Sequence, residues 1–266
     1  MSGYQKRRKH TNKNLETVEE RAQSDAARNG RKAEEILAGH IQSNDDSTKW
    51  IVEEISENSY SKTGAKHRAG IEKPDVVLFD RQSGKDYGFI SLKCCKDFAT
   101  AFNQIKRCSL TNFCKEFSAP KSIELILEKY TYRRKKLLRD GNNYSQNELE
   151  ELLLFLNKNQ KPLLISAFTG QAKQPKANWL LLHQWKFPDW QRNIACRDRS
   201  RLISMQEVIA TFEDIQATFT KRGTITFGAG VTLQRKGGDN GKESANDLQF
   251  KLRIAPLLEA LAKFRK

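Results

Sequence analysis

Apolar residues at a helical spacing mark the first regular element of the chain. Ala33, Ile36, Leu37 and Ile41 recur every three or four residues and share one face of a helix that we predict over residues 15–43. Further helices are expected at about 98–117, 121–139, 146–158 and 204–213 and after Pro256. These segments would form the helical part of the fold.

Two short apolar runs predict a β-hairpin. Val76–Phe79 and Tyr87–Lys93 flank the turn-forming run Asp80–Asp86. Gly, Ser and Asp between two such runs are typical of a hairpin turn, so the two strands are expected to pair.

Four other segments are predicted as strands. The unbroken apolar runs at 162–168 and 179–183 are typical of buried strands. Near the C-terminal end, 224–233 and 248–254 alternate between apolar and polar residues. A polar, Gly-rich stretch at 237–246 would join these last two into a second hairpin.

The order of these elements predicts a mixed fold. Residues 58–73 contain Ser, Lys and two Gly and are expected to form a loop, and Trp50–Val52 is a short apolar stretch. Because no segment has the composition of a linker, we predict one domain of the α/β or α+β class over residues 15–266.

The composition excludes several classes of protein. Hydrophobic residues make up 38% of the 266 positions and include 14 Phe, so a wholly disordered chain is excluded. No apolar run reaches the ~18–20 residues of a membrane span, and the first 13 residues lack the apolar segment of a secretory signal. Five Cys, an odd number without a CxxC spacing, indicate reduced thiols and a cytoplasmic location.

Positive charge is the strongest compositional signal. Lys and Arg number 47 against 32 Asp and Glu, and the resulting formal charge of +15 favours a polyanionic partner, above all nucleic acid. Residues 1–13 carry five basic and no acidic residues, so we expect a disordered basic arm over 1–14. Six basic residues between Lys129 and Arg139 fit a solvated helix face as well as they fit DNA.

One pair of charged residues has the spacing of a hydrolytic site. Asp75 follows Pro74 at the start of one hairpin strand, and Lys93 lies eighteen residues later on the other. Alternation along the second strand places Ser91 and Lys93 on one face, so Lys93 can point toward Asp75. A carboxylate with a neighbouring backbone carbonyl can bind Mg²⁺, and a lysine can orient or deprotonate water and offset charge on a phosphate. The pair therefore suits phosphodiester hydrolysis.

The segment Pro74-Asp75 … Ser91-Leu92-Lys93 resembles the PD-(D/E)xK nuclease motif, with Ser91 where the family usually has Asp or Glu. The resemblance implies that Asp75 and the backbone carbonyl of Leu92 hold Mg²⁺. It further implies that Lys93 positions and activates water, while Ser91 gives a supporting hydrogen bond. The implied fold is a restriction-endonuclease-like core, a mixed β-sheet flanked by helices, over about residues 28–117.

Family members commonly draw a further glutamate from the helix before the sheet, and this chain offers Glu34 and Glu35. At ~100° per residue, Glu34 lies at the border of the apolar face beside Leu37, whereas Glu35 points to the solvated side. We therefore prefer Glu34 as a metal ligand, with Glu35 as the alternative. Serine is a poor metal ligand and the next helix offers Asn103 and Gln104 in place of an acid, so one Mg²⁺ ion is favoured over two.

A second resemblance lies near the C-terminal end. The segment Gly228–Asp239 … Leu248–Lys251 resembles the tail of many bacterial type II restriction endonucleases, and Phe102–Arg107 resembles a helix that packs near their active site. We expect DNA contacts from the hairpin at about 221–254. Gln and Arg side chains suit base edges, whereas Lys236, Lys251 and Arg253 more naturally meet phosphates. The residues expected to contact DNA are Gln234, Arg235, Lys236, Lys251, Arg253, Asn103 and Gln104.

Other candidate groups have simpler explanations. Cys94 and Cys95 have neither a nearby His nor a metal-site spacing, and we expect small core residues there. His183 lies inside an apolar run and is expected to be a hydrogen-bonded core residue. No P-loop or dinucleotide fingerprint is present, which disfavours ATP or NAD as a cofactor.

Together these features predict a type II restriction endonuclease of the PD-(D/E)xK kind. It would cleave double-stranded DNA at a specific sequence with Mg²⁺, leave 5′-phosphate ends, and act in a bacterial or archaeal cytoplasm beside a separately encoded methyltransferase. A palindromic target implies a homodimer, and a monomer that nicks one strand at a time is the alternative. Two other interpretations are a DNA-binding protein in which Asp75 and Lys93 form a structural salt bridge, and a nuclease of DNA repair.

Overall fold

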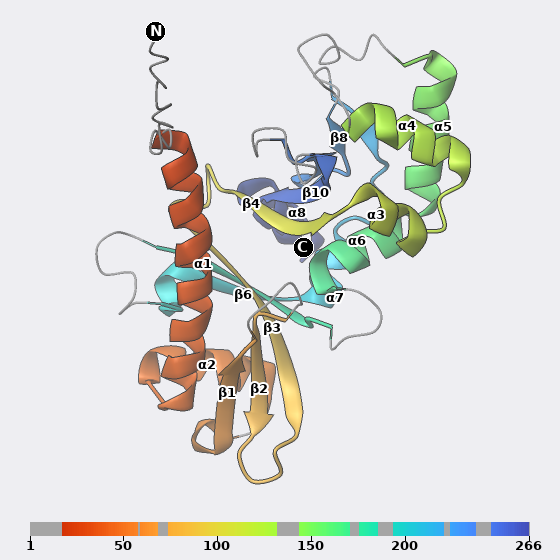
Figure 1. The fold of residues 1–266 in the computed structure, drawn as a ribbon. Coiled ribbons are helices and arrows are strands. Elements are labelled where there is room, and N and C mark those ends of the chain that lie inside the picture. Colours follow the sequence, from red (N-terminus) through yellow and green to blue (C-terminus); the bar gives the residue numbers. More distant parts are fainter. Residues whose placement is uncertain are drawn as a thin grey trace, which may run out of the picture.

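The structure is a computed structural model that describes residues 18–57, 59–68, 74–131, 144–170, 176–185, 194–220, 224–237 and 246–265. The predicted basic arm over 1–14 lies outside the described residues, as do most of the basic residues counted between Lys129 and Arg139. Figure 1 shows two β-sheets with helices around them.

The first sheet contains the predicted hairpin. Its strands follow the order β1-β2-β3-β5-β6 and are antiparallel except for the parallel pair β3–β5. The strands span β1 (Thr63–His67), β2 (Val76–Asp80), β3 (Asp86–Cys95), β5 (Trp179–Gln184) and β6 (Ser200–Ser204). The prediction of a mixed sheet is thus confirmed.

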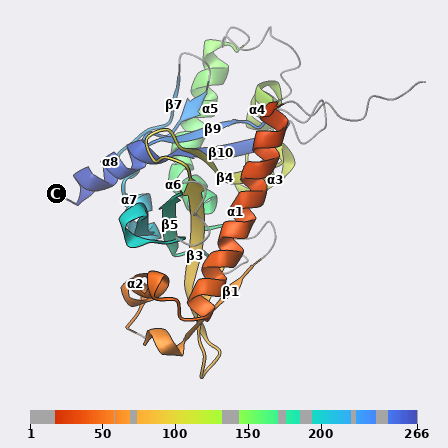
Figure 2. The ribbon, with the colours of Figure 1, turned by 90° about the vertical axis from the view of Figure 1, so that its left-hand side faces the viewer.

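The second sheet is antiparallel throughout and has the order β4-β10-β9-β8-β7. Its strands span β4 (Phe102–Cys108), β10 (Leu248–Arg253), β9 (Val231–Arg235), β8 (Ile225–Thr226) and β7 (Thr218–Phe219). Figure 2 shows these strands crossing the upper part of the molecule beside the N-terminal part of the long helix α1 (Val18–Gln42).

The other helices are short by comparison. They span α2 (Asp46–Ile55), α3 (Leu110–Glu116), α4 (Lys121–Thr131), α5 (Gln146–Lys158), α6 (Gln160–Thr169), α7 (Met205–Ala210) and α8 (Ile254–Phe264), with single 3₁₀ turns at Tyr60–Lys62 and Arg197–Arg199. Within the described ranges, no helix has the length and apolar character needed to cross a membrane.

Helices cover both faces of the first sheet. Along β5, Leu181 belongs to a core shared with α1 and α2, whereas its neighbours Leu180 and Leu182 belong to a larger core shared with α6 and the second sheet. Because side chains alternate along a strand, β5 contributes to both cores at once. The flanking helices predicted from the sequence are therefore present.

Helix α1 forms because its apolar residues share one face. Ala33, Leu37 and Ile41 are fully buried. The helix ends at Gln42, and Asn44 follows with a φ of 57°, a left-handed conformation that is common after helix C-termini. The predicted helix is confirmed within the described residues, and it packs against β1 and β2.

The helix predicted over 98–117 was wrong. This segment forms β4 and then the short helix α3, with Ser109 as the N-cap whose Oγ accepts a hydrogen bond from the N–H of Asn112 (3.2 Å). β4 pairs with β10, which lies far along the chain. The sequence around β4 cannot reveal a partner strand so far along the chain. Within β4, Gln104 is exposed and its neighbour Ile105 is buried.

Two further predictions were wrong. The run 162–168, predicted as a strand, lies in α6, which is buried on most sides, and a continuous apolar run does not distinguish a buried helix from a buried strand. The segment 58–73, predicted as a loop, contains β1, which pairs with β2. The short apolar stretch Trp50–Val52 belongs to α2.

Most other predicted elements are confirmed. β2 and β3 form the first hairpin, β5 is a strand, α5 and α7 are helices, and α4 is a helix within the described part of the 121–139 segment. The alternating segment 224–233 divides into β8 and β9 around Gly228 and Gly230, whose φ values of 73° and 83° favour glycine. β9 pairs with β10 as the second predicted hairpin, and the closing helix α8 begins at Ile254.

As expected, Cys95 and His183 are buried and Cys94 packs against a core. All five cysteines are free. Burial raises the pKa of Cys95 to about 12 and also raises that of Cys94, so both remain neutral thiols, which are weak nucleophiles. His183 is buried, and its Nδ1 lies 2.9 Å from the hydroxyl of Ser200.

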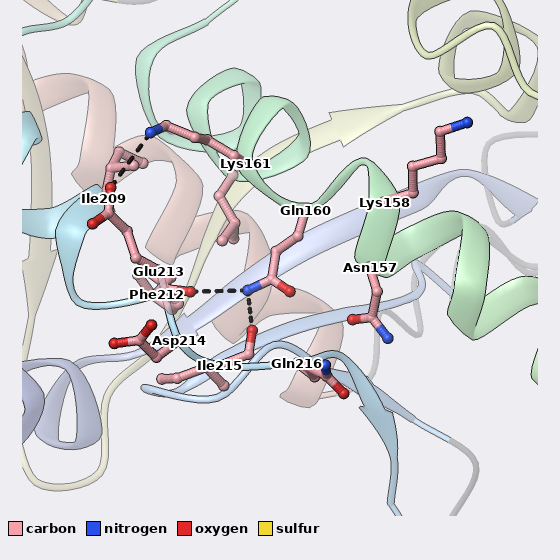
Figure 3. Close-up of a pocket in the computed structure, with 11 residues that line it drawn as sticks. Asn157, Lys158, Gln160, Lys161, Ile209, Phe212, Glu213, Asp214, Ile215 and Gln216 are labelled. Carbon is pink, nitrogen blue, oxygen red and sulfur yellow. Dashed lines mark hydrogen bonds and ion pairs between the residues drawn. The ribbon is translucent and has the colours of Figure 1, made fainter.

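A pocket of about 600 Å³ lies where the α5–α6 corner meets the segment after α7 (Figure 3). Gln160 reaches across it, and its Nε2 donates to the main-chain carbonyls of Phe212 (3.0 Å) and Ile215. This one side chain therefore ties helix α6 to the loop that leads into the second sheet.

We expect Gln160→Ala to lower the free energy of unfolding by about 1–2 kcal/mol, because two carbonyls lose their donor. Urea unfolding measures the effect. Lys161→Ala is the control, since it removes only an exposed ion pair with Glu213 (3.4 Å) at the same pocket, and it should change stability little. Equal losses in the two variants would contradict the role assigned to Gln160.

Candidate active site

Asp75 lies at the entry of β2, where its main chain already belongs to the sheet. Its N–H donates to the carbonyl of Ile90 (2.9 Å), and its carbonyl accepts from the N–H of Arg68 (3.1 Å). These two bonds hold Asp75 between the neighbouring strands, and its side chain is only 15% exposed.

Three consecutive residues of β3 converge on one oxygen of this side chain. Asp75 Oδ2 accepts hydrogen bonds from the hydroxyl of Ser91 (3.1 Å), the N–H of Leu92 (2.7 Å) and Nζ of Lys93 (3.3 Å). Among the described residues, Oδ1 has no hydrogen-bond partner. The carboxylate is thus anchored through one oxygen, and the other is left for a ligand.

Lys93 connects two oxygens that could bind a cation. Its Nζ donates to the backbone carbonyl of Leu92 (2.9 Å) as well as to Asp75, and its side chain is 14% exposed. A lysine held at this position has donors for a water or a phosphate oxygen near the same two atoms. Ser91 is fully buried, so its hydroxyl supports Asp75 from beneath the site.

Glu34 reaches the same edge of the sheet from helix α1. Its side chain is 19% exposed, against 63% for Glu35, and its Oε2 lies 3.2 Å from Nε2 of His67 at the end of β1. The structure therefore places Glu34 at this edge and leaves Glu35 largely in solvent.

The pKa of Glu34 is raised above its ordinary value. Burial is the main cause, and the negative charge of Asp75 adds to it, while Lys93 and His67 act in the opposite direction. A cation bound beside Glu34 would offset both effects and favour its ionised form.

The donor set suits a hard divalent cation. It consists of the two carboxylates and the carbonyl of Leu92, and within the described part of the chain no group of three or more His, Cys, Asp or Glu side chains is arranged to hold a metal ion. Mg²⁺ is commonly held by one or two carboxylates together with waters and substrate phosphates. The two carboxylates and the carbonyl therefore fit a hard divalent cation whose other ligands are waters and substrate phosphates.

His67 is the residue at this site that sequence reasoning missed. Its segment was predicted as a loop, whereas β1 pairs with β2 and places His67 opposite Val76, next to Asp75. The usable signal was the short run Thr63–His67 just before Pro74, which has the length of an edge strand.

Asn103 and Gln104 lie on β4, not on a helix as predicted. Nδ2 of Asn103 donates to the carbonyl of Cys94 (3.3 Å), so this side chain is directed at the end of the strand that carries Lys93. Gln104 is exposed and pairs in register with Lys251. The two neighbours therefore contact different parts of the molecule.

The second sheet has one apolar and one polar face. Phe250 and its alternate neighbours on β10 belong to the larger core, whereas Gln249, Lys251 and Arg253 alternate with them and share the other face. Lys251 Nζ lies 4.7 Å from the ring centroid of Phe102, and burial lowers the pKa of Lys251. This polar face, which we call the β10 face, is basic and carries hydrogen-bonding side chains.

The other predicted DNA-contacting residues lie on β9 or just after it. Gln234 is in register with Gln249 and so belongs to the β10 face. Arg235 is in register with the core residue Leu248, and its Nη2 donates to Oδ1 of Asn246 (3.2 Å) at the rim of the sheet. Lys236 follows directly after β9. The almost fully buried Gln249 was not predicted from the sequence.

Comparisons with known proteins place this chain in a family. The family model of the R.HinP1I restriction endonuclease matches residues 76–258. The matched region includes Ser91, Lys93 and both hairpins, begins one residue after Asp75, and does not reach Glu34. No curated protein matches the chain.

Among solved structures, the restriction endonuclease MspI in complex with its cognate DNA is similar at 11% sequence identity and a TM-score of 0.49. The similarity covers 79% of this chain and 78% of that one. Since the family model spans more than half of the sequence, the chain belongs to the R.HinP1I restriction endonuclease family and is a type II restriction endonuclease.

Proposed function

We propose that this restriction endonuclease hydrolyses phosphodiester bonds of double-stranded DNA at a specific sequence, with Mg²⁺ as its cofactor and 5′-phosphate ends as its products. The supporting observation is the convergence of Lys93 Nζ on Asp75 Oδ2 (3.3 Å) and on the carbonyl oxygen of Leu92 (2.9 Å). Glu34 lies at the same edge of the sheet.

Asp75, Glu34 and the carbonyl of Leu92 would hold the metal ion. When bound, Mg²⁺ supplies Lewis-acid polarisation of the phosphate and lowers the pKa of water. Lys93 orients the attacking water and offsets the charge that builds on the phosphate oxygens. Ser91 holds Oδ2 of Asp75 and so limits rotation of that carboxylate.

The proposed reaction is a displacement at phosphorus. The water oriented by Lys93 attacks opposite the 3′-oxygen, the bond between phosphorus and that oxygen breaks, and a proton ends on the released 3′-hydroxyl. The phosphate therefore stays on the 5′ end of the downstream fragment. One carboxylate set, formed by Asp75 and Glu34, supports a single ion rather than two.

The β10 face is proposed as the DNA-reading surface. Gln234 can pair with base edges, and Lys251 and Arg253 with phosphates. The buried Gln249 donates from Nε2 to the carbonyl of Lys236 (3.4 Å) and would support this face from within. Arg235 and Lys236 lie at the rim of the same sheet, where they would meet the backbone. Gln104 lies on this face, and Asn103 links it to the catalytic strand. The net charge of +15 adds affinity that does not depend on sequence.

The proposed assembly is a homodimer on a palindromic site, because the two-fold symmetry of the protein then matches that of the DNA. A monomer that nicks one strand and then the other is the alternative. The enzyme would act in a bacterial or archaeal cytoplasm, where a separately encoded methyltransferase protects the cellular DNA at the same sequence.

Digestion of unmethylated phage DNA tests this proposal. We expect sharp, reproducible fragments with Mg²⁺ and intact DNA with a chelator, and sequencing of the fragment ends should show 5′-phosphates and one recognition sequence. A smear of fragments would contradict site specificity. Intact, retarded DNA in the presence of Mg²⁺ would favour binding without catalysis.

A further inference from the structure

His67 is a half-buried polar residue at the active-site edge to which the proposed mechanism gives no role. Its side chain is 16% exposed, and it lies at the end of β1, in register with the residue that follows Asp75. Its Nε2 is 3.2 Å from Oε2 of Glu34. The nearest other carboxylate oxygen, on Glu35, is 4.0 Å from Nδ1, beyond hydrogen-bond distance.

The direction of the hydrogen bond follows from the chemistry of its partners. An ionised carboxylate only accepts hydrogen bonds, so Nε2 of His67 must carry the proton when Glu34 is charged. The bond occupies Oε2 and leaves Oε1 of Glu34 for another ligand. One imidazole nitrogen thereby fixes which oxygen of Glu34 is available.

We propose that His67 is a positioning residue that fixes the Glu34 carboxylate for metal binding through its Nε2–H donor. This inference rests on the proposed function, in which Glu34 is a metal ligand. It goes beyond that function because His67 itself contacts neither the metal nor the DNA in the proposed mechanism.

The environment of Glu34 explains why such a donor is needed. The Glu34 side chain is 19% exposed at the edge of the sheet, so it has an open route toward solvent. Without a fixed donor, the side chain of Glu34 can rotate outward, and the metal then loses a ligand. The hydrogen bond from Nε2 of His67 holds Oε2 in place and so favours the inward position of the carboxylate.

Three substitutions separate the donor from the rest of the histidine. His67→Ala removes it, His67→Gln places an amide nitrogen near the position of Nε2, and His67→Asn places one near the position of Nδ1. Calcium binding by calorimetry in the absence of DNA is the first measurement, because it does not depend on cleavage. The Mg²⁺ concentration for half-maximal cleavage is the second.

We expect His67→Ala to weaken calcium binding about 10-fold, as loss of a hydrogen bond to a metal ligand typically does. His67→Gln should restore most of that affinity and His67→Asn should not. Half-maximal cleavage should need correspondingly more Mg²⁺ in His67→Ala, with nearly unchanged cleavage at saturating Mg²⁺. His40→Gln is the matched control, since His40 lies on α1 beside Asp45 (3.3 Å) away from this edge, and it should bind calcium as the wild type does.

The outcomes distinguish this inference from the proposed function. If Glu34→Ala weakens calcium binding and His67→Ala does not, the positioning role is overturned while the metal site stands. If Glu34→Ala binds calcium as tightly as the wild type, the metal assignment itself fails. Equal calcium affinities of the Gln and Asn variants at position 67 would also overturn the inference, and melting temperatures without metal show whether each variant folds.

Discussion

Replacing Lys93 by Met, or Asp75 by Asn, should lower the rate of DNA cleavage by about 10³-fold while leaving DNA affinity nearly unchanged. Both substitutions keep the shape of the side chain and remove its charge. Lys93 then no longer orients water or offsets charge on the phosphate, and Asp75 no longer offers a charged ligand to the metal. Single-turnover cleavage with Mg²⁺ gives the rate, and anisotropy of labelled DNA with Ca²⁺ in place of Mg²⁺ gives the affinity.

The chain offers a matched control for this experiment. Lys66 and Asp86 form a second lysine–aspartate pair on the same sheet, with Nζ 2.6 Å from Oδ1, and the lysine is largely exposed. Lys66→Met should leave cleavage close to the wild-type rate. If Lys93→Met and Lys66→Met cleave alike, the buried pair of Lys93 and Asp75 is a structural salt bridge and the chemistry lies elsewhere.

The approach of Lys93 to Asp75 could be predicted because its geometry is local. Asp75 and Lys93 lie on two strands joined by one short turn, and the alternation of side chains along β3 determines which of its residues share a face with Lys93. The position of Glu34 was predictable for a similar reason, because the periodicity of α1 distinguishes its inner from its outer glutamate. Both arguments use only neighbours in the sequence.

The contribution of β1 and β4 could not be predicted, because their partners are not local patterns. β1 is a short edge strand in a segment rich in loop-forming residues, so the sequence does not predict that His67 lies on a strand. The sequence of β4 alone is typical of a helix, and only the pairing with β10 makes it a strand. In this strand the side chain of Asn103 is directed at Cys94, whereas Gln104 lies on the β10 face. Sequence patterns therefore predicted the hairpin of β9 and β10, but neither the strand β4 beside it nor the faces on which Asn103 and Gln104 lie.

Acidification should destabilise the enzyme through His183, even though this residue takes no part in the chemistry. Burial lowers the pKa of His183 from 6.5 to about 4, because the charged imidazole is disfavoured in the core. The unfolded chain binds this proton below about pH 6.5 and the folded one only near pH 4. Above about pH 6.5, titration of His183 costs the protein no stability. As the pH falls from 6.5 toward 4, the free energy of unfolding falls by about 3 kcal/mol in all.

Urea unfolding at several pH values between 7.5 and 4.5 measures this loss against His183→Asn. An asparagine amide keeps a partner near the position of Nδ1 for Ser200 but cannot take up a proton, so the wild type should lose its stability advantage over the variant as the pH falls. A constant difference between the two proteins would show that another group controls the acid sensitivity. β5 pairs His183 with Cys94, the residue after Lys93, so the acid-sensitive histidine lies on the strand next to Lys93.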